Sequence, residues 1–215
     1  MKVVIVGAGG HAKVVCDAIL ASGTPASDIV GFADDNPELV GRTVLGFPVL
    51  PGIDSLGLAG SASLAMGVGD NAARRHLFDR ARALGYTVTT VVHPQAVIGR
   101  GCRVGPGTVL LANVVVNADT EVGDNVILNT ACSVDHDCVV GAHCHVAPGA
   151  TVAGGVRIGE ETLLGIGSTV IPGLSIGARC VVGAGAVLLT DLEAGCVAVG
   201  VPARVIKQRP GGIRG

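Results

Sequence analysis

The hydrophobic pattern of the second half of the chain repeats every six residues. In steps of six from residue 98 to residue 188, all sixteen positions hold Val, Ile or Leu, without an insertion. Four residues after each of them lies a second position, which is nearly always small. An even period suits extended chain, whose side chains alternate between two faces. The pattern predicts short strands joined by turns and stacked as a solenoid, with coils about 4.8 Å apart.

Two residue types fit this solenoid. Glycine often follows the large aliphatic residue, as at Gly99, Gly105 and Gly123. We expect it to provide turn dihedrals that other residues avoid. Five of the seven cysteines fall at the small inward positions, where we expect them to act as small buried hydrophobic residues. They are Cys102, Cys132, Cys138, Cys144 and Cys180.

The first 85 residues follow a different pattern, typical of a truncated Rossmann-like unit. Residues 2–6 are expected to form a buried strand, and residues 13–20 a helix. Between them lies the sequence GAGGHA, which has the G-x-G-x-x-A form of a phosphate-binding turn. A second strand over 29–33 ends in two aspartates, and a third over about 63–68 ends at Gly69. Asn71 is predicted to cap a helix over 72–84.

The glycine turn and the aspartates indicate a nucleotide. Gly9 and Gly10 would point backbone N–H groups and a helix N-terminus at a phosphate. Asp34 and Asp35 could accept hydrogen bonds from ribose hydroxyls. The unit is too short for the two halves that hold a dinucleotide, so a mononucleotide, such as that of an activated sugar, fits better than NAD. A glycine turn used only for packing is the alternative.

Composition and charge exclude several classes. The formal net charge is −2 and no long run has one sign, which gives no electrostatic case for nucleic acid or an anionic membrane. No apolar stretch reaches the length of a membrane span, and the N-terminus does not resemble a signal peptide. The odd number of cysteines follows no disulfide or zinc spacing. We therefore expect a protein of the reducing cytoplasm.

One histidine is placed for catalysis. His136 falls on a predicted turn, points outward and has Asp135 and Asp137 as neighbours. A carboxylate beside an imidazole can fix its tautomer and stabilise the imidazolium, which suits a general base. Which aspartate supports the histidine is open, and a solvated turn histidine is the alternative.

Both halves together resemble one group of proteins. The glycine turn, the aspartate pair, Gly-Asp-Asn at 69–71, the segment NTACSVDHDC at 129–138 and the tail GVPAR at 200–204 carry the resemblance. The group is that of the sialic-acid O-acetyltransferase-like and nucleotide-sugar N-acetyltransferases, within the hexapeptide-repeat acyltransferases. It includes enzymes acting on UDP-linked bacillosamine precursors and on GDP-perosamine.

The resemblance implies a left-handed parallel β-helix, a homotrimer with sites between neighbouring prisms, acetyl-CoA as co-substrate and no metal. It implies residues 1–87 as a Rossmann-like domain binding a nucleotide sugar, and residues 88–215 as the catalytic, acetyl-CoA-binding β-helix domain. The catalytic residues would be His136 and Asp137. The cofactor-binding residues would be His145, Gly154, Ile166 and Ala184. The substrate-binding residues would be Gly9, Gly10, His11, Asp34, Asp35, Gly69 and Asn129.

The expected reaction is acetyl transfer to the amino group, with the 4-amino group favoured, of a nucleotide-linked deoxyamino sugar for surface glycans. One alternative is O-acetylation of a sugar hydroxyl, as in sialic acid. A second is a non-catalytic nucleotide-binding scaffold. A third is a zinc hydratase using His136, His143 and His145, because gamma-class carbonic anhydrases share the prism. The sequence leaves open the sugar, the choice of UDP or GDP, and the acyl chain.

Overall fold

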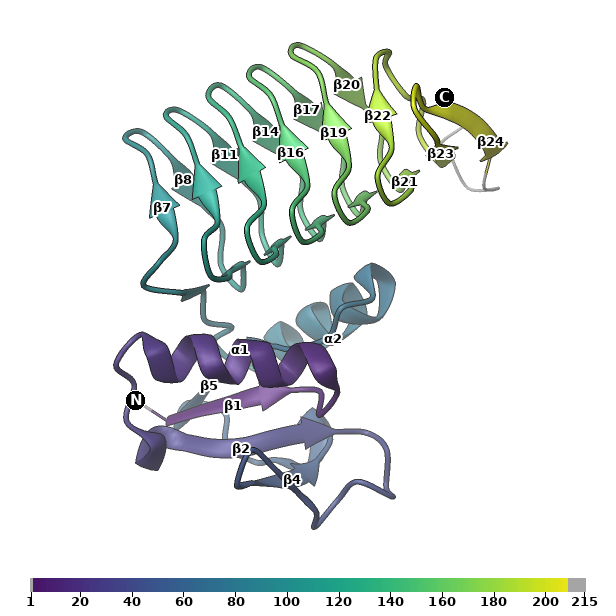
Figure 1. Ribbon diagram of the computed structural model, residues 1–215. Coiled ribbons are helices and arrows are strands. Elements are labelled where there is room, and N and C mark those ends of the chain that lie inside the picture. Colours follow the sequence, from purple (N-terminus) through teal and green to yellow (C-terminus); the bar gives the residue numbers. More distant parts are fainter. Residues whose placement is uncertain (1, 209–215) are drawn as a thin grey trace.

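The computed structural model describes residues 2–208, which form an α/β unit followed by a left-handed parallel β-helix (Figure 1). In the α/β unit, five strands make one sheet in the order β3-β4-β2-β1-β5. All pairs are parallel except the hairpin of β3 and β4 at one edge. The strands are β1 Lys2–Val6, β2 Ile29–Asp34, β3 Thr43–Val44, β4 Phe47–Pro51 and β5 Ala62–Met66.

Two helices cover opposite faces of this sheet. Helix α1 (Gly10–Ala21) packs on the face that carries Val3 and Ile5, and α2 (Asn71–Ala83) packs on the other face. Single turns of 3-10 helix lie at Ala26–Asp28 and Ile53–Ser55. The predicted cap of α2 is wrong by one residue. Asp70 is the N-cap, because its carboxylate accepts a hydrogen bond of 2.8 Å from the backbone N–H of Ala73.

The β-helix consists of three sheets whose strands are parallel and two residues long, except for the longer β23 and the antiparallel β24 at the C-terminal end. The first sheet holds β6 Val91–Val92, β9 Val109–Leu110, β12 Ile127–Leu128, β15 His145–Val146, β18 Leu163–Leu164, β21 Val181–Val182, β23 Cys196–Val199 and the antiparallel β24 Arg204–Gln208. The second sheet holds β7 Val97–Ile98, β10 Val115–Val116, β13 Ser133–Val134, β16 Thr151–Val152, β19 Thr169–Val170 and β22 Val187–Leu188. The third sheet holds β8 Arg103–Val104, β11 Glu121–Val122, β14 Val139–Val140, β17 Arg157–Ile158 and β20 Ser175–Ile176.

The register of these sheets shows that three hexads make one coil. Val116 pairs with Val134, and Val134 with Val152, so neighbours on successive coils are eighteen residues apart. The large aliphatic residues of the repeat point inward, and those from Leu110 to Leu188 are almost fully buried. Ile98 is an exception, with 41% exposed, because it lies in the first coil, where no earlier coil covers it.

The glycines that follow the large aliphatic residues have a different role from the one predicted. Gly99 does not have a positive φ, but a Cβ atom there would lie 2.7 Å from the backbone N of Ala118 in the next coil. Glycine is therefore needed for close approach between coils. The left-handed turn residue comes two positions later, as at Gly101 with φ of 76°, and recurs every six residues from 101 to 185.

Four of the five inward cysteines, all except Cys132, are seen as hydrogen-bond donors as well as small core residues. The thiol of Cys144 donates to the carbonyl of Gly159, at 3.1 Å, and the hydroxyl of Thr120 donates to the carbonyl of Asp135, at 2.6 Å. Each of these two donors thus binds a carbonyl fifteen residues further along the chain. Burial raises the pKa of the Cys144 thiol to about 12, which keeps the proton on sulfur.

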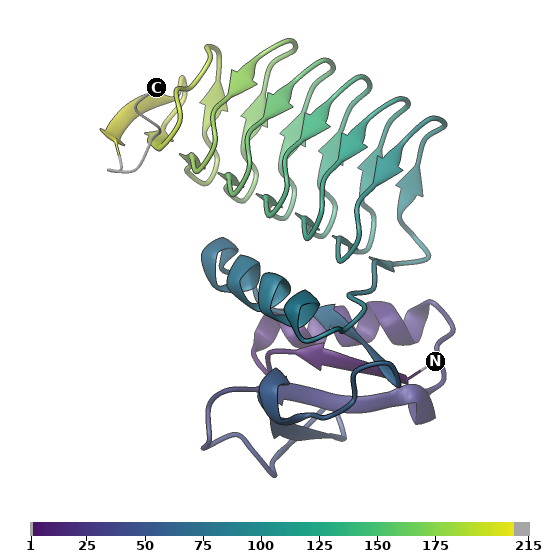
Figure 2. The same ribbon diagram turned by 180° about the vertical axis from the view of Figure 1, so that it is seen from behind.

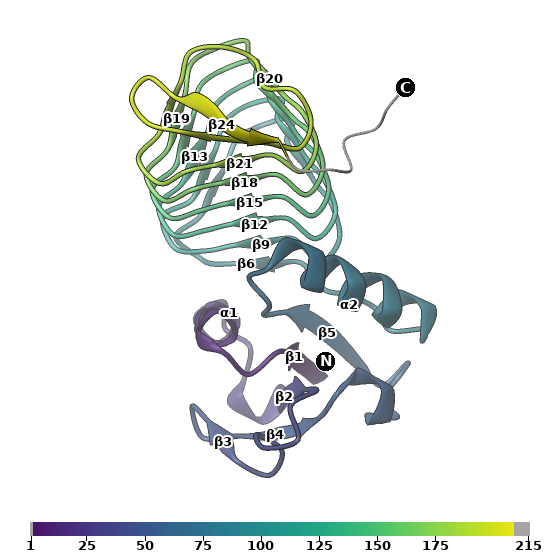
Figure 3. The same cartoon turned by 90° about the vertical axis from the view of Figure 1, so that its right-hand side faces the viewer.

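The α/β unit lies against the first sheet of the β-helix, with β5 as its nearer edge (Figure 3). Val88 still pairs with Leu64 of β5, three residues before the β-helix begins at Val91. The outward residues Val109 and Ile127 are fully buried. The two units therefore share an apolar interface instead of being joined by an open linker.

Candidate active site

His136 lies in the turn between β13 and β14, at the corner where the second and third sheets meet. Its Nδ1 is 2.7 Å from Oδ2 of Asp137. Asp137 has a φ of 58°, at the left-handed position of the turn. Aspartate is among the few residues with a side chain that tolerate this conformation. The turn geometry therefore places a carboxylate directly beside the ring.

Asp135 supports the same turn in another way. Its Oδ1 accepts hydrogen bonds from the backbone N–H of His136, at 2.9 Å, and from the amide of Asn117, at 2.7 Å. These hydrogen bonds, that of Asn117 first, lower the pKa of Asp135. Asp137 thus contacts the ring and Asp135 the backbone. Asn117 was not predicted, although it precedes Asp135 by the eighteen residues of one coil.

The ring of His136 is exposed to solvent on one side and rests on glycine on the other. A Cβ atom at Gly154, one coil further on, would lie 2.6 Å from Cε1 and 2.7 Å from Nε2 of the ring. The hydrogen bond to Asp137 and then the charge of Asp135 raise the pKa of His136. The imidazole is therefore a stronger base than an isolated histidine.

The glycine turn of the α/β unit has the features of a phosphate-binding loop. Gly7 has a φ of 92°, which a tight turn after β1 requires. A Cβ atom at Gly9 would meet nothing within 4 Å, so its backbone is open to an approaching group. Ala12 of α1 is fully buried, and a Cβ atom at Gly67 would lie 2.7 Å from the Cβ atom of Ala12. The small residues at these two positions therefore allow α1 to pack closely on the turn that follows β5.

A cavity opens beside this turn at the carboxyl ends of the parallel strands. Its volume is about 150 Å³, and its walls are Val6, Gly7, Ala33, Asp34, Asp35, Gly52, Ile53, Val68 and Leu77. Asp34 also holds the glycine turn, because its Oδ2 accepts a hydrogen bond of 2.8 Å from the backbone N–H of Ala8. Ligands of open α/β sheets bind at this end of the strands.

A second polar cluster lies between the two units. The ring of His11, at the start of α1, is 6.2 Å from that of His145 on β15. Nε2 of His145 is 3.0 Å from the amide nitrogen of Asn129, and Nε2 of His11 is buried and has no hydrogen-bond partner among residues 2–208. Burial first, and then the charge of Arg74, lower the pKa of both histidines to about 4. Both rings are therefore neutral at physiological pH.

Within one chain, the predicted site residues fall into separate places. Gly154 stacks on His136 at the corner between the second and third sheets. Ile166 and Ala184 lie one coil apart at the corner between the first and second sheets. His145 is on the first sheet, on the side covered by the α/β unit. The side of the prism formed by the second sheet separates His136 and Gly154 from Ile166, Ala184 and His145.

Arg74 is a buried residue that the sequence did not reveal. Its side chain is fully buried in α2, where it faces the β-helix. A long charged side chain on a polar helix normally predicts an exposed position.

Across residues 2–208, no three His, Cys, Asp or Glu side chains are grouped as metal ligands would be. No helix in that range is long and apolar enough to cross a membrane.

Hexapeptide coils with a histidine–carboxylate pair on a turn define the class of hexapeptide-repeat acyltransferases. The family profile for the PglD N-terminal domain matches residues 2–81, and that for the bacterial transferase hexapeptide matches residues 119–154 and 155–190. A search of curated proteins finds no match.

Solved structures are similar over nearly the whole chain. PerB from Caulobacter crescentus, solved with CoA and GDP-perosamine, is 41% identical, with a TM-score of 0.90 over 96% of this chain and 98% of that one. The acetyltransferase domain of PglB from Neisseria gonorrhoeae is 34% identical, with a TM-score of 0.88 over 95% and 99%. WeeI from Acinetobacter baumannii is 27% identical, with a TM-score of 0.89 over 96% and 100%. The chain belongs to the family of hexapeptide-repeat nucleotide-sugar N-acetyltransferases that these proteins represent.

Proposed function

We propose that the protein transfers the acetyl group of acetyl-CoA to the amino group of a nucleotide-linked sugar. The observation that carries this proposal is the pair of His136 and Asp137, a base held by a carboxylate on an exposed turn of the β-helix. The glycine turn and acidic cavity of the same chain suit a nucleotide. PerB, its 41% identical relative, was solved with CoA and a GDP-linked sugar.

The role of His136 is general-base catalysis. When Nδ1–H donates to Asp137, Nε2 of the neutral ring is the proton acceptor. The sugar amine attacks the thioester carbonyl carbon, and Nε2 takes the proton that the amine loses. The imidazolium then returns this proton to the sulfur of CoA as the carbon–sulfur bond breaks. Asp137 fixes the tautomer and stabilises the imidazolium.

The two units divide the ligands between them. Residues 1–87 bind the nucleotide sugar, with Asn129 as a contribution from the β-helix, and residues 88–215 bind acetyl-CoA and carry the base. Of the residues assigned to the nucleotide sugar, His11 and Asn129 contact or face His145. His145 is therefore assigned to the point where the acetyl group of acetyl-CoA meets the sugar. The nucleotide is assigned to Gly9, Gly10, Asp34, Asp35 and Gly69, and acetyl-CoA to His145, Gly154, Ile166 and Ala184.

The separation of these residues within one chain supports a homotrimer with shared sites. His136 of one copy would face the corner of Ile166 and Ala184 on its neighbour. The experiment is to mix the inactive variants His136→Ala and His145→Ala under conditions that exchange subunits. Random trimers should recover about a quarter of wild-type activity, because one site in four then pairs two intact halves. No recovery, or a monomer by light scattering, would contradict the shared site.

The acceptor is an amine, with the 4-amino group of a deoxyhexose favoured. A neutral amine is already a good nucleophile, whereas a hydroxyl depends on the removal of its proton. The test follows CoA release with a UDP- or GDP-linked 4-amino-4,6-dideoxyhexose, its 4-hydroxy analogue and free sialic acid. The amino sugar should give the highest kcat/KM. A higher value for a hydroxyl acceptor would establish O-acetylation, and no CoA release with any acceptor would favour a non-catalytic scaffold.

A cytoplasmic location and a role in surface glycan synthesis complete the proposal. All seven cysteines are unpaired, as is usual in reducing compartments. Fractionation of the native host, with an antibody against the protein, tests the location directly. Recovery in the periplasmic or membrane fraction would contradict it.

A further inference from the structure

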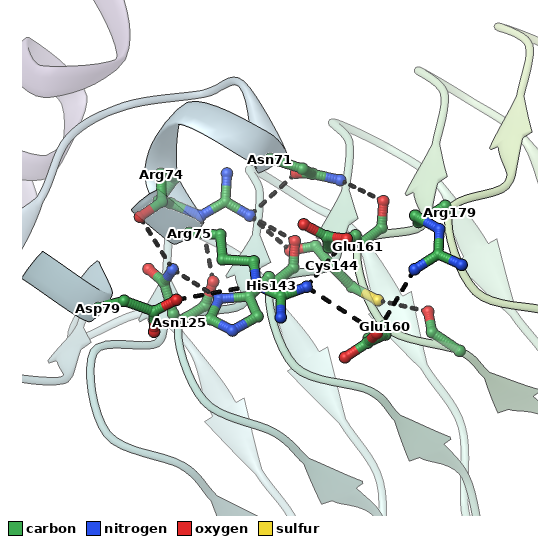
Figure 4. Close-up of polar contacts among 11 residues, drawn as sticks. Asn71, Arg74, Arg75, Asp79, Asn125, His143, Cys144, Glu160, Glu161 and Arg179 are labelled. Atoms are coloured by element: carbon green, nitrogen blue, oxygen red, sulfur yellow. Dashed lines mark hydrogen bonds and ion pairs between the residues drawn. The ribbon is translucent and has the colours of Figure 1, made fainter. Parts of the chain in front are cut away.

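Arg74 lies in the first turn of α2 and is fully buried (Figure 4). It makes six hydrogen bonds of 2.8 to 3.3 Å, and each acceptor is a carbonyl oxygen. None of the ion pairs found within residues 2–208 includes Arg74. Burial lowers its pKa to about 10, so the guanidinium is still charged at neutral pH. A buried cation that is bound only by neutral oxygens needs an explanation beyond ordinary charge pairing.

The acceptors of Arg74 belong to two different parts of the molecule. On the α/β side they lie in the loop of residues 68–71 and are the carbonyls of Val68 and Gly69 and the side chain of Asn71. On the β-helix side they are the backbone carbonyls of Asn125, His143 and Cys144. The planar fork of one guanidinium therefore connects the loop to two successive coils. Figure 2 shows α2 alongside the β-helix, as these contacts require.

Each end of this connection adjoins a proposed binding residue. Val68 forms part of the wall of the cavity with Gly7 and Asp34. Cys144, whose carbonyl accepts a hydrogen bond of 3.1 Å from Arg74, directly precedes His145. Arg74 therefore joins the segment that forms part of the wall of the nucleotide cavity to the residue that precedes His145.

We infer that Arg74 is a positioning residue, which sets the spacing between the nucleotide cavity and His145 by binding the 68–71 loop to the β-helix. The inference rests on the proposed function of these two places. Arg74 acts through other residues, because its side chain is fully buried and presents no surface to a substrate. Its fork makes six directed contacts that a lysine, with a single ammonium group, cannot reproduce. Without them, a bound nucleotide sugar would present its amine in a range of positions.

The neighbouring Arg75 provides a matched control. It lies on the same helix and crosses the same interface to Glu161, at 3.1 Å, but its side chain is 39% exposed. Exposed ion pairs contribute little to stability, and the ion pair of Arg75 with Glu161 does not involve the carbonyls of the 68–71 loop. Arg74→Lys and Arg75→Lys thus make the same chemical change at adjacent positions. Asn71→Ala is a milder variant, because it removes one of the six acceptors of Arg74, together with the hydrogen bond of 2.9 Å that the amide of Asn71 donates to the carbonyl of Glu161.

The first measurement is steady-state kinetics of the full chain with both substrates. Arg74→Lys should lower kcat/KM for the nucleotide amino sugar by about 10- to 100-fold, the usual effect of an ångström-scale misplacement. The KM for acetyl-CoA should be unchanged, because that ligand is assigned to the β-helix. Arg75→Lys should match the wild type. A loss that disappears when the rates are divided by the concentration of folded enzyme, measured by thermal unfolding, would indicate simple destabilisation and overturn the inference.

The second measurement is hydrogen exchange of the protein without ligand, which does not depend on the proposed reaction. Arg74→Lys should speed exchange in residues 67–73 and 143–146 and leave residues 163–188 unchanged. Asn71→Ala should show a smaller change in the same segments, and it decides the question if Arg74→Lys does not fold. Equal exchange in the Arg74 and Arg75 variants would refute the positioning role. If Arg74→Lys alters exchange as expected but the wild-type protein is inactive on every nucleotide amino sugar, only the proposed function is rejected.

Discussion

The imidazole of His136 lies against Gly154, its neighbour on the next coil, with no room between them for a side chain. Gly154 does not have a positive φ, so alanine can adopt its backbone conformation. The Cβ atom of Gly154→Ala would instead displace the ring from Asp137. We expect a near wild-type melting temperature and a fall in kcat of about tenfold or more. In a double-mutant cycle with His136→Ala, the second change should have no further effect. Additive losses would show that Gly154 acts elsewhere.

His136→Ala tests the base itself. Turnover should fall by about 10²- to 10⁴-fold, the usual contribution of a general base. The melting temperature should be unchanged, because the side chain of His136 is 60% exposed. Single-turnover kinetics with saturating acetyl-CoA separate the chemical step from product release. Wild-type turnover in this variant would remove His136 from the mechanism.

Asp137→Asn should change the pH dependence of the reaction. Asp137 is the largest cause of the raised pKa of His136, and a base must be deprotonated to act. In the wild type, kcat/KM should therefore fall on acidification with a midpoint above that of an ordinary histidine. The variant should shift this midpoint to lower pH and lose less activity than His136→Ala. Asp135→Asn, which affects the backbone contact, is the comparison. An unshifted midpoint in Asp137→Asn would assign the electrostatic role to Asp135.

Gly9→Leu should weaken nucleotide-sugar binding and leave acetyl-CoA binding intact. Gly9 has a φ of −82°, which leucine adopts readily, and its Cβ atom would meet nothing within 4 Å. The variant should therefore fold normally but block the approach of a phosphate to the turn. Calorimetric titration with UDP, GDP and acetyl-CoA measures each affinity separately. Equal losses for the nucleotides and acetyl-CoA would contradict the division of ligands between the units.

The sequence predicted the β-helix because its repeat is a direct consequence of coil geometry. Each inward residue has to fill the same space, so Val, Ile or Leu recurs in register over sixteen positions. The hairpin of β3 and β4 was missed because Thr43–Val44 and Phe47–Pro51 are short and contain no alternating pattern. The local His136–Asp137 contact could be anticipated because the two residues are adjacent.

Contacts between the units could not be predicted in this way. The carbonyls of His143 and Cys144 that bind Arg74 are 69 and 70 residues away in sequence. Backbone carbonyls have no side-chain identity, so no motif marks them. The approach of His11 to His145 likewise depends on how the α/β unit packs on the first sheet of the β-helix. Such contacts follow from tertiary packing, which a single sequence does not encode locally.

That packing predicts a loss of stability in mild acid. His11 and His145 have pKa values of about 4, below the value of about 6.5 for an unfolded histidine. Between these values the unfolded chain binds protons that the folded chain does not, so the free energy of unfolding decreases as pH falls. Each histidine should contribute on the order of 1–2 kcal/mol to this decrease between pH 7 and 5.

Urea unfolding at pH 7, 6 and 5 measures this dependence. His145→Asn should be less stable than the wild type at pH 7 but lose less stability on acidification, because one of the two buried bases is gone. His76→Asn is the control, since His76 is exposed on α2 and should leave the slope unchanged. A wild-type slope in His145→Asn would mean that the ring is not held neutral between the units. The contact of His11 with His145 would then be too loose to place a sugar between the nucleotide cavity and the β-helix.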